Sequence, residues 1–326
     1  MPQTWTRGFQ IKVVGLCALL MGCAPPYETD PAKLFEGRSA PTFHEYSIED
    51  RNIHYAAAGE THRPLIIFLH GTPGTWKAFA TFLGQSDLVE RARLIAVDRP
   101  GFGKSDYKVL LPSLARQAHL LQPLLNQDAT GCGAILVGHS LGAPLAVRMA
   151  VEFPEQIGGL VLIAPSIDPD LEDPRWYNHL ATYRIVNWAV PTPLILANQE
   201  VMALQGELRE MMPLWEQLSS PMTLIQGGKD KLVLPANADF AERMAKSPLK
   251  MVRVPDAGHF ILWEQPDLIV QEILEMLDSL PQNPRKHADM IGRHQPRWIQ
   301  IREKDRPTVA TAESRPVGSI EMVPSP

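Results

Sequence analysis

The sequence has few of the features that mark disulfide-rich, nucleic-acid-binding or multi-spanning membrane proteins. It holds three cysteines in 326 residues, too few for a disulfide scaffold. Its formal net charge is −5, so it lacks the basic surplus typical of nucleic-acid binding, and it has no acidic block. With 45% hydrophobic and 21% charged residues, the composition is that of a globular protein large enough to bury a core.

The N-terminus has the pattern of an export signal. Arg7 and Lys12 are followed by an apolar run over residues 13–22, which is too short to cross a bilayer. The run ends in Leu20-Met21-Gly22-Cys23, which resembles the lipobox of bacterial lipoproteins. The resemblance implies cleavage before Cys23 and lipid attachment to its thiol; the alternative is an ordinary export signal with an incidental cysteine. Ala24 resembles the residue that accompanies outer-membrane sorting.

We therefore expect an exported, membrane-anchored lipoprotein on the periplasmic or cell-surface side, in the outer membrane where the organism has one. Residues 1–22 would be the signal peptide, and the proline-containing residues 23–41 a tether. Removal of Cys17 and acylation of Cys23 would leave Cys132 without a disulfide partner. Residues 281–326 hold seven prolines and carry a net charge of +3 (eight Lys/Arg minus five Asp/Glu), which predicts a disordered tail.

Between the two ends, short apolar runs alternate with longer amphipathic stretches. Such runs suit strands buried on both faces of a parallel sheet, and the alternation predicts an α/β sheet covered by helices. The first two predicted strands are expected to form an antiparallel pair at the start of this sheet. The predicted strands are 43–48, 53–58, 65–69, 94–97, 134–137, 160–163, 222–225 and 251–254, and the predicted helices are 75–83, 111–125, 141–152, 236–245 and 268–280.

One segment interrupts the alternation between the sixth and seventh predicted strands. A structureless loop of this length is improbable in a compact domain, and the segment carries aromatic residues with Leu and Met at helical spacing. We predict a helical cap over residues 166–219, inserted into a sheet domain made of residues 42–165 and 220–280. The aromatic residues are expected in its core or against a ligand pocket.

A nucleophilic serine is predicted where the fifth strand meets the following helix. Gly138-His139-Ser140-Leu141-Gly142 fits G-x-S-x-G, and it lies between the predicted strand and helix that confirm this motif. Glycines two residues before and after the serine leave room for a strained turn that exposes the hydroxyl near a helix N-terminus. His139 occupies the variable position and is not expected to be catalytic.

The serine requires a general base and a carboxylate that orients it. His259 follows the last predicted strand, and Asp230 follows the strand before it, 29 residues earlier. The competing acids are Asp168 and Asp170, which follow the sixth strand. The oxyanion is expected to be bound by two backbone N–H groups, those of Leu141 and of Thr72 in the loop after the third strand. No histidine shows metal-ligand spacing, and no metal site is predicted.

Together these residues resemble the cap-bearing branch of the α/β-hydrolase superfamily. That branch shows H-G-x-P-G, here His70–Gly74, and D-R-P-G-F-G-x-S, here Asp98–Ser105, in which Phe102 is a candidate pocket residue. The resemblance covers residues 42–280. It implies an eight-stranded, mostly parallel sheet with a helical cap, the order Ser140, Asp230, His259, and no cofactor.

The nucleophile narrows the reaction class. Epoxide hydrolases and haloalkane dehalogenases of this fold carry aspartate where this chain has Ser140, and serine favours acyl transfer. We therefore expect a serine hydrolase, foremost a carboxylesterase acting on small or medium acyl esters. A C–C bond hydrolase or a perhydrolase would use the same triad. An aminopeptidase or amidase of the proline iminopeptidase type would hold its substrate amine with the cap acids Glu172, Asp173, Glu200 or Glu207. A non-catalytic binding lipoprotein on the same scaffold also stays open at this point.

Overall fold

The computed structural model describes residues 35, 39–174, 178 and 190–281, which all belong to one unit of the chain, Met1–His294. The predicted signal peptide, most of the predicted tether and the predicted tail after Pro281 lie outside the described residues. Phe35, inside the segment predicted as a tether, is buried in the hydrophobic core.

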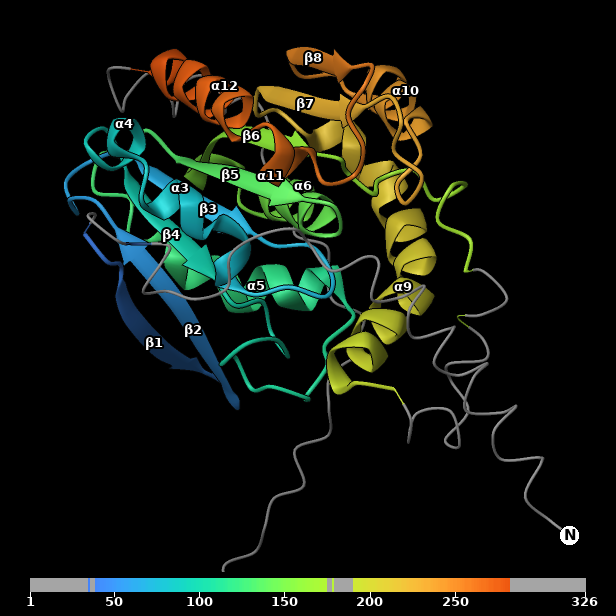
Figure 1. Cartoon of the computed structure of the whole chain (residues 1–326), viewed down its shortest axis with the longest axis horizontal. Coiled ribbons are helices and arrows are strands. Elements are labelled where there is room, and N and C mark those ends of the chain that lie inside the picture. Colours follow the sequence, from blue (N-terminus) through green and yellow to red (C-terminus); the bar gives the residue numbers. More distant parts are fainter. Residues whose placement is uncertain (1–34, 36–38, 175–177, 179–189, 282–326) are drawn as a thin grey trace, which may run out of the picture. The chain divides into compact units, whose positions relative to one another are not determined.

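Eight strands form one sheet in the order β1-β2-β4-β3-β5-β6-β7-β8 (Figure 1). The β1–β2 and β2–β4 pairs are antiparallel, and every other pair is parallel. This confirms the predicted α/β class and the mostly parallel eight-stranded sheet. The strands are β1 (Thr42–Ile48), β2 (Arg51–Ala58), β3 (Leu65–Leu69), β4 (Arg93–Val97), β5 (Ala134–His139), β6 (Ile157–Ile163), β7 (Met222–Gly227) and β8 (Leu249–Val254).

The central strands are buried along their whole length because helices cover both faces of the sheet. Every residue of β3, β4, β5 and β6 is buried, whereas the edge strands β1 and β8 are partly exposed. Two hydrophobic clusters flank the sheet. One contains α5 (Leu114–Leu125), α6 (Gly142–Glu152) and α10 (Ala236–Met244); the other contains α3 (Ala80–Leu83), α4 (Ser86–Val89), α11 (Ile261–Glu264) and α12 (Pro266–Ser279).

The helix ends follow local capping chemistry more closely than the apolar pattern predicts. Helix α5 begins at Leu114 rather than at 111, because the Ser113 side chain accepts a hydrogen bond from the Arg116 N–H and caps the helix. Helix α12 begins two residues earlier than predicted, at Pro266, since proline suits the first turn of a helix. The apolar pattern does not predict the four-residue helices α4 and α11, because they are too short to show an apolar period.

The segment inserted between β6 and β7 begins with residues 164–174, which are not helical, and is mostly helical from residue 192 onward. It holds α9 (Thr192–Met211) and the 3-10 helix η3 (Met212–Gln217); two further 3-10 helices are η1 (Trp76–Phe79) and η2 (Pro154–Gln156). Figure 1 shows α9 on the side of the sheet toward which the arrowheads of β5 and β7 point. Over the described residues, none of the helices combines the length and apolar character that a membrane span requires.

Candidate active site

Ser140 lies on a tight turn between β5 and α6. Its φ angle is 53°, in the left-handed region that non-glycine residues adopt at a cost of roughly 1–3 kcal/mol. The turn is held by its neighbours: the Ser140 N–H donates to the Ile163 carbonyl over 2.9 Å, and the Ser140 carbonyl accepts from the Ala143 N–H over 3.0 Å. The surrounding structure therefore keeps this serine in a strained conformation at the end of the central strand.

The two motif glycines are required by close packing around that turn. A Cβ atom on Gly142 would lie 2.0 Å from the Leu69 carbonyl oxygen, and one on Gly138 would lie 2.6 Å from the Ala143 Cα. Both distances are far below any real contact of a Cβ atom. The turn can thus form only with glycine at these positions, as the sequence pattern predicts.

His259 and Asp230 are hydrogen-bonded to one another after adjacent strands. The His259 Nδ1 atom lies 2.8 Å from Asp230 Oδ2, and the Asp230 side chain is completely buried. The other carboxylate oxygen accepts the N–H groups of Leu232 at 2.8 Å and Val233 at 2.9 Å. Since this carboxylate accepts from His259, the ring carries its proton on Nδ1 and leaves Nε2 available as a base.

The competing acids lie in other interactions. Asp168 is 3.6 Å from the guanidinium of Arg243, and Asp170 accepts from Arg209 over 3.1 Å. The His259 ring is bonded to Asp230 instead, as the chain order of the motifs predicts.

Ser140 and His259 line one cavity of about 90 Å³ together with the loop after β3. The N–H groups of Thr72 and Leu141 make no hydrogen bond with any described residue, so both are available to a ligand. The structure thus brings together, at the carboxyl ends of β3, β5, β7 and β8, all five residues predicted for the triad and the oxyanion site. The described lining comprises Gly71, Thr72, Pro73, Gly74, Ala78, His139, Ser140, Leu232, His259, Phe260 and Trp263.

His139 also contributes to this cavity, although the sequence pattern marks it only as a variable position. Its ring packs 5.1 Å from that of His259 and 5.0 Å from that of Trp263. Burial lowers the pKa of His139 to about 3, and the nearby His259 contributes in the same direction. His139 is therefore neutral and acts as a packing and hydrogen-bonding residue beneath the site.

The Asp98–Ser105 segment is a structural loop held by a buried carboxylate. Asp98 accepts hydrogen bonds from the Trp76 N–H at 2.8 Å and the Lys104 N–H at 2.9 Å, and its Oδ2 lies 2.8 Å from His54 Nδ1. Phe102, a candidate pocket residue from the sequence, is absent from the described lining of the cavity. It instead packs edge-on against His70, with ring centroids 5.5 Å apart.

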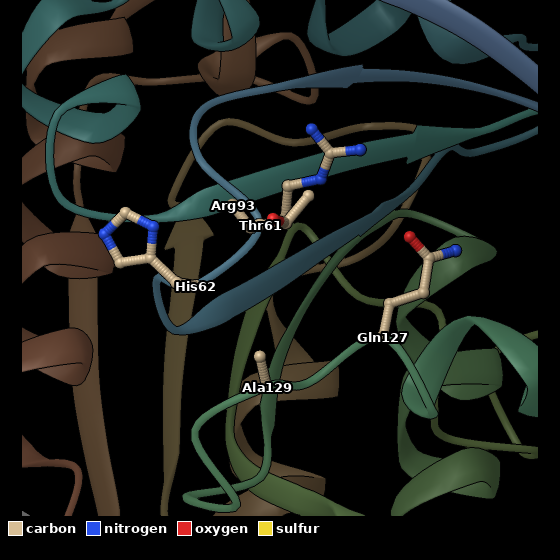
Figure 2. A pocket seen from close by; sticks show the side chains of 5 residues that line it. All are labelled: Thr61, His62, Arg93, Gln127 and Ala129. Atoms are coloured by element: carbon tan, nitrogen blue, oxygen red, sulfur yellow. The ribbon is translucent and has the colours of Figure 1, made fainter.

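A larger cavity of about 330 Å³ opens elsewhere on the domain, and Figure 2 shows the five side chains around it. The buried Arg93 lines it, and its Nη1 donates to the Gly59 carbonyl over 2.9 Å. Ser140 and His259 line the smaller cavity, whereas none of the predicted catalytic residues lines this larger one. Its lining residues are Thr61, His62, Arg93, Gln127 and Ala129. Within the described ranges, no cluster of three His, Cys, Asp or Glu residues could hold a metal ion.

Comparison with known proteins identifies the family. The model of the alpha/beta hydrolase family matches residues 66–272, which is more than half of the chain. The chain therefore belongs to the alpha/beta hydrolase family, and the hydrolase relatives that it matches support hydrolase activity.

Three similar proteins illustrate the range of this family. A 2-(acetamidomethylene)succinate hydrolase of Mesorhizobium japonicum is 25% identical over 66% of this chain and 88% of that enzyme. A 2-hydroxy-6-oxo-6-phenylhexa-2,4-dienoate hydrolase of Comamonas testosteroni is 35% identical, over 37% of this chain and 42% of that enzyme. The structure of MGS-M2, an alpha/beta hydrolase from a Medee basin deep-sea metagenome library, superposes with a TM-score of 0.59 at 18% identity, covering 73% and 98% of the two chains. At that identity the structural likeness shows the fold alone.

Proposed function

We propose that the protein is a serine hydrolase that acts through an acyl-enzyme, with small or medium carboxylic esters as its substrates. The proposal rests on one arrangement: Ser140, on its strained turn, shares a cavity with a histidine whose Nδ1 is 2.8 Å from the buried carboxylate of Asp230. A hydroxyl is scarcely ionised at neutral pH, and this histidine is the base that would activate it.

In the proposed reaction, Ser140 Oγ attacks the ester carbonyl carbon while its proton passes to His259 Nε2. The carbonyl oxygen becomes an oxyanion bound by the N–H groups of Thr72 and Leu141. Collapse of this intermediate breaks the bond to the alcohol, which leaves with the proton from His259. Water then attacks the acyl-enzyme by the same route, so that the acid is released and Ser140 regains its proton. Asp230 would stabilise the imidazolium form of His259 in both halves.

The described lining of the cavity favours a neutral substrate. Among the described residues that line it, none is lysine or arginine, and Leu232, Phe260 and Trp263 supply apolar surface. An ester with an uncharged acyl chain fits such a lining. A second candidate function is hydrolysis of a small carboxylate substrate, the kind that the relatives' names state. Its support is the 25% identity with the Mesorhizobium enzyme, which spans 88% of that enzyme. The absence of a cation from the described lining disfavours it.

The aminopeptidase alternative is weakened by the bonding of the cap acids. Glu200 is paired with the guanidinium of Arg99, and Glu207 accepts the Leu114 N–H over 2.7 Å. Burial raises the pKa of Glu172 to about 7, so half of this group is uncharged near neutral pH. A substrate ammonium would therefore find few free carboxylates in the described part of this segment.

A fluorophosphonate probe and a graded series of p-nitrophenyl esters, run beside proline p-nitroanilide, test the proposal. We expect the wild-type protein to be labelled stoichiometrically, Ser140→Ala to remain unlabelled, and the esters to be turned over faster than the anilide. Ser166→Ala is a matched control, because this buried serine lies nearby but outside the cavity. Absence of labelling in the intact wild type, or equal labelling of Ser140→Ala, would contradict the proposal and favour a non-catalytic binding protein.

We further propose that the enzyme is anchored to a membrane through lipid on Cys23. The support is the lipobox-like Leu20–Cys23 segment after a short basic and apolar stretch. Anchoring would place a hydrolase of small esters on the periplasmic or cell-surface side of the membrane that carries it.

A further inference from the structure

The carbonyl of Gly71 and the N–H of Thr72 belong to the same peptide unit, at the start of the proposed oxyanion site. Among the described residues, Thr72–Pro73 is the only cis peptide bond. The Gly71–Thr72 bond is therefore trans. In a planar trans peptide the N–H points opposite to the C=O. Any group that fixes the direction of the Gly71 carbonyl therefore also fixes the direction of the Thr72 N–H.

Two buried side chains fix that carbonyl. His70 Nδ1 lies 2.6 Å from the Gly71 oxygen, and Arg99 Nη2 donates to the same oxygen over 3.2 Å. The backbone N–H of Arg99 donates to His70 Nε2 over 3.0 Å, which requires the neutral ring with its proton on Nδ1. Burial, with the charge of Arg99 as the next contribution, holds the pKa of His70 well below its usual value, in agreement with that tautomer.

The Arg99 guanidinium is itself held by helix α9 of the inserted segment. Its Nη1 and Nη2 atoms donate to the two carboxylate oxygens of Glu200 over 2.8 and 2.9 Å. The Arg99 Nε atom donates to the His70 carbonyl over 2.8 Å, and the second N–H of Nη1 donates to Gln117 Oε1 over 3.0 Å. With the bond to Gly71, all five guanidinium N–H groups have an acceptor, and both charged side chains are at most 1% exposed.

We propose that Arg99 and Glu200 are positioning residues, through which helix α9 sets the direction of the Thr72 N–H that binds the oxyanion. This inference rests on the proposed function, because it assigns a role within that site. Lysine could not replace Arg99, since a single ammonium group lacks the planar fork that reaches both the Glu200 carboxylate and the loop carbonyls. The position of α9 and the reactivity of Ser140 are then linked through Arg99 and the Gly71–Thr72 peptide.

A buried ion pair is a poor source of net stability, and this makes the proposal testable. Replacing both partners with apolar residues of similar size is often neutral or stabilising, whereas removing one leaves an unpaired buried charge. The test is the double variant Arg99→Met/Glu200→Leu, assayed with p-nitrophenyl butyrate and with a trifluoromethyl ketone, which forms an oxyanion on Ser140. The matched control is Arg148→Met/Glu152→Leu, which removes a hydrogen-bonded ion pair within α6.

We expect the double variant to keep a cooperative thermal transition and to lose about 10- to 100-fold in kcat, less than the ~10²–10³ typical of deleting an oxyanion donor. KM should stay within about twofold, ketone affinity should fall in parallel with kcat, and the pH midpoint of kcat/KM should not move, because His259 is outside this network. The Arg148/Glu152 control should keep its wild-type kcat. If the double variant does not fold, Arg99→Lys, which keeps a charge opposite Glu200 but lacks the planar fork, should show the same pattern of losses.

A folded double variant with wild-type kcat and ketone affinity would overturn the positioning role and leave the proposed function intact. A loss that shifts the pH midpoint would also overturn it, because it would place the effect on the triad. A wild-type protein that neither reacts with fluorophosphonate nor turns over esters would instead refute the proposed function itself.

Discussion

The ring of His139 donates a hydrogen bond from Nε2 to the backbone carbonyl of His259, over 3.2 Å, and the two rings lie 5.1 Å apart. The residue beside the proposed nucleophile thereby supports the backbone of the proposed base. Because this hydrogen bond needs only a neutral donor and the site is buried, a charged His139 would be strongly disfavoured in the folded protein.

Stability should consequently fall on acidification, with His139 as an identifiable contributor. Its folded-state pKa of about 3 lies below the value near 6.5 of an unfolded chain, so the unfolded state binds more protons between these values. The stability that the neutral ring contributes is complete above pH 6.5 and is lost as the pH falls toward 3. The measurement is urea unfolding at pH 7.5 and pH 5. Between these two pH values, the free energy of unfolding of His139→Gln should fall by about 2 kcal/mol less than that of the wild type.

The control for this measurement is His44→Gln, because His44 is exposed on the edge strand β1. It should lose as much stability as the wild type between the two pH values. Equal losses for wild type and His139→Gln would show that the buried ring does not govern acid sensitivity.

Asp230→Asn should reduce kcat by on the order of 10³–10⁴-fold while leaving the fold intact. The amide would no longer stabilise the imidazolium form of His259, although its oxygen could still accept the N–H groups of Leu232 and Val233. Steady-state kinetics and circular dichroism would measure the two effects. Asp170→Asn serves as the comparison, and we expect near-wild-type activity from it. If Asp230→Asn retained full activity, the acid would have to be sought at Asp168 or Asp170.

Glu172 should make the protein less stable at alkaline pH. Burial raises its pKa from 4.5 to about 7, and the carboxylates of Asp168 and Asp230 contribute in the same direction. The folded state therefore holds a proton that the unfolded state releases, and the stability linked to that proton is lost as the pH rises through 7. Glu172→Gln should raise the melting temperature at pH 8 and change it little at pH 4.5, as followed by differential scanning fluorimetry.

The exposed neighbour Asp173 provides a matched control for Glu172. Asp173→Asn should leave the difference between the melting temperatures at pH 8 and pH 4.5 as it is in the wild type. A Glu172→Gln variant with the same difference as wild type would mean that this carboxyl is ionised in the folded protein at neutral pH.

Cys23→Ser should release the protein from membranes, because the proposed lipid attachment requires the thiol. The measurement is fractionation of expressing bacteria into soluble and membrane pools, followed by detection of the protein. Cys132→Ser is the control, since that thiol is partly buried in the domain and donates to the Pro281 carbonyl over 3.0 Å. Continued membrane association of Cys23→Ser would show that something other than lipid on this cysteine holds the protein there.

Much of the sheet can be predicted because buried strands are apolar over short runs. The apolar pattern predicts all eight strands, and each observed strand overlaps its predicted range. The helix starts at Leu114 and Pro266 differ from prediction because they depend on a capping side chain and on proline, not on apolar period. Phe102 is a candidate for the pocket from its place in the motif, but its ring turns to His70, and a motif carries no information on side-chain direction.

The sequence by itself determined the Ser140 turn and the chain order of the proposed triad. Glycines two residues before and after the serine, between an apolar strand and a helix, allow the tight turn because they have no Cβ atom to collide with the backbone packed around it. Only the tertiary structure decided that Glu200 meets Arg99, 101 residues away in the chain, and that Asp230 rather than Asp168 meets His259. Contacts of that kind depend on how whole helices and strands pack, because a buried charge finds its partner only when distant segments have been brought together.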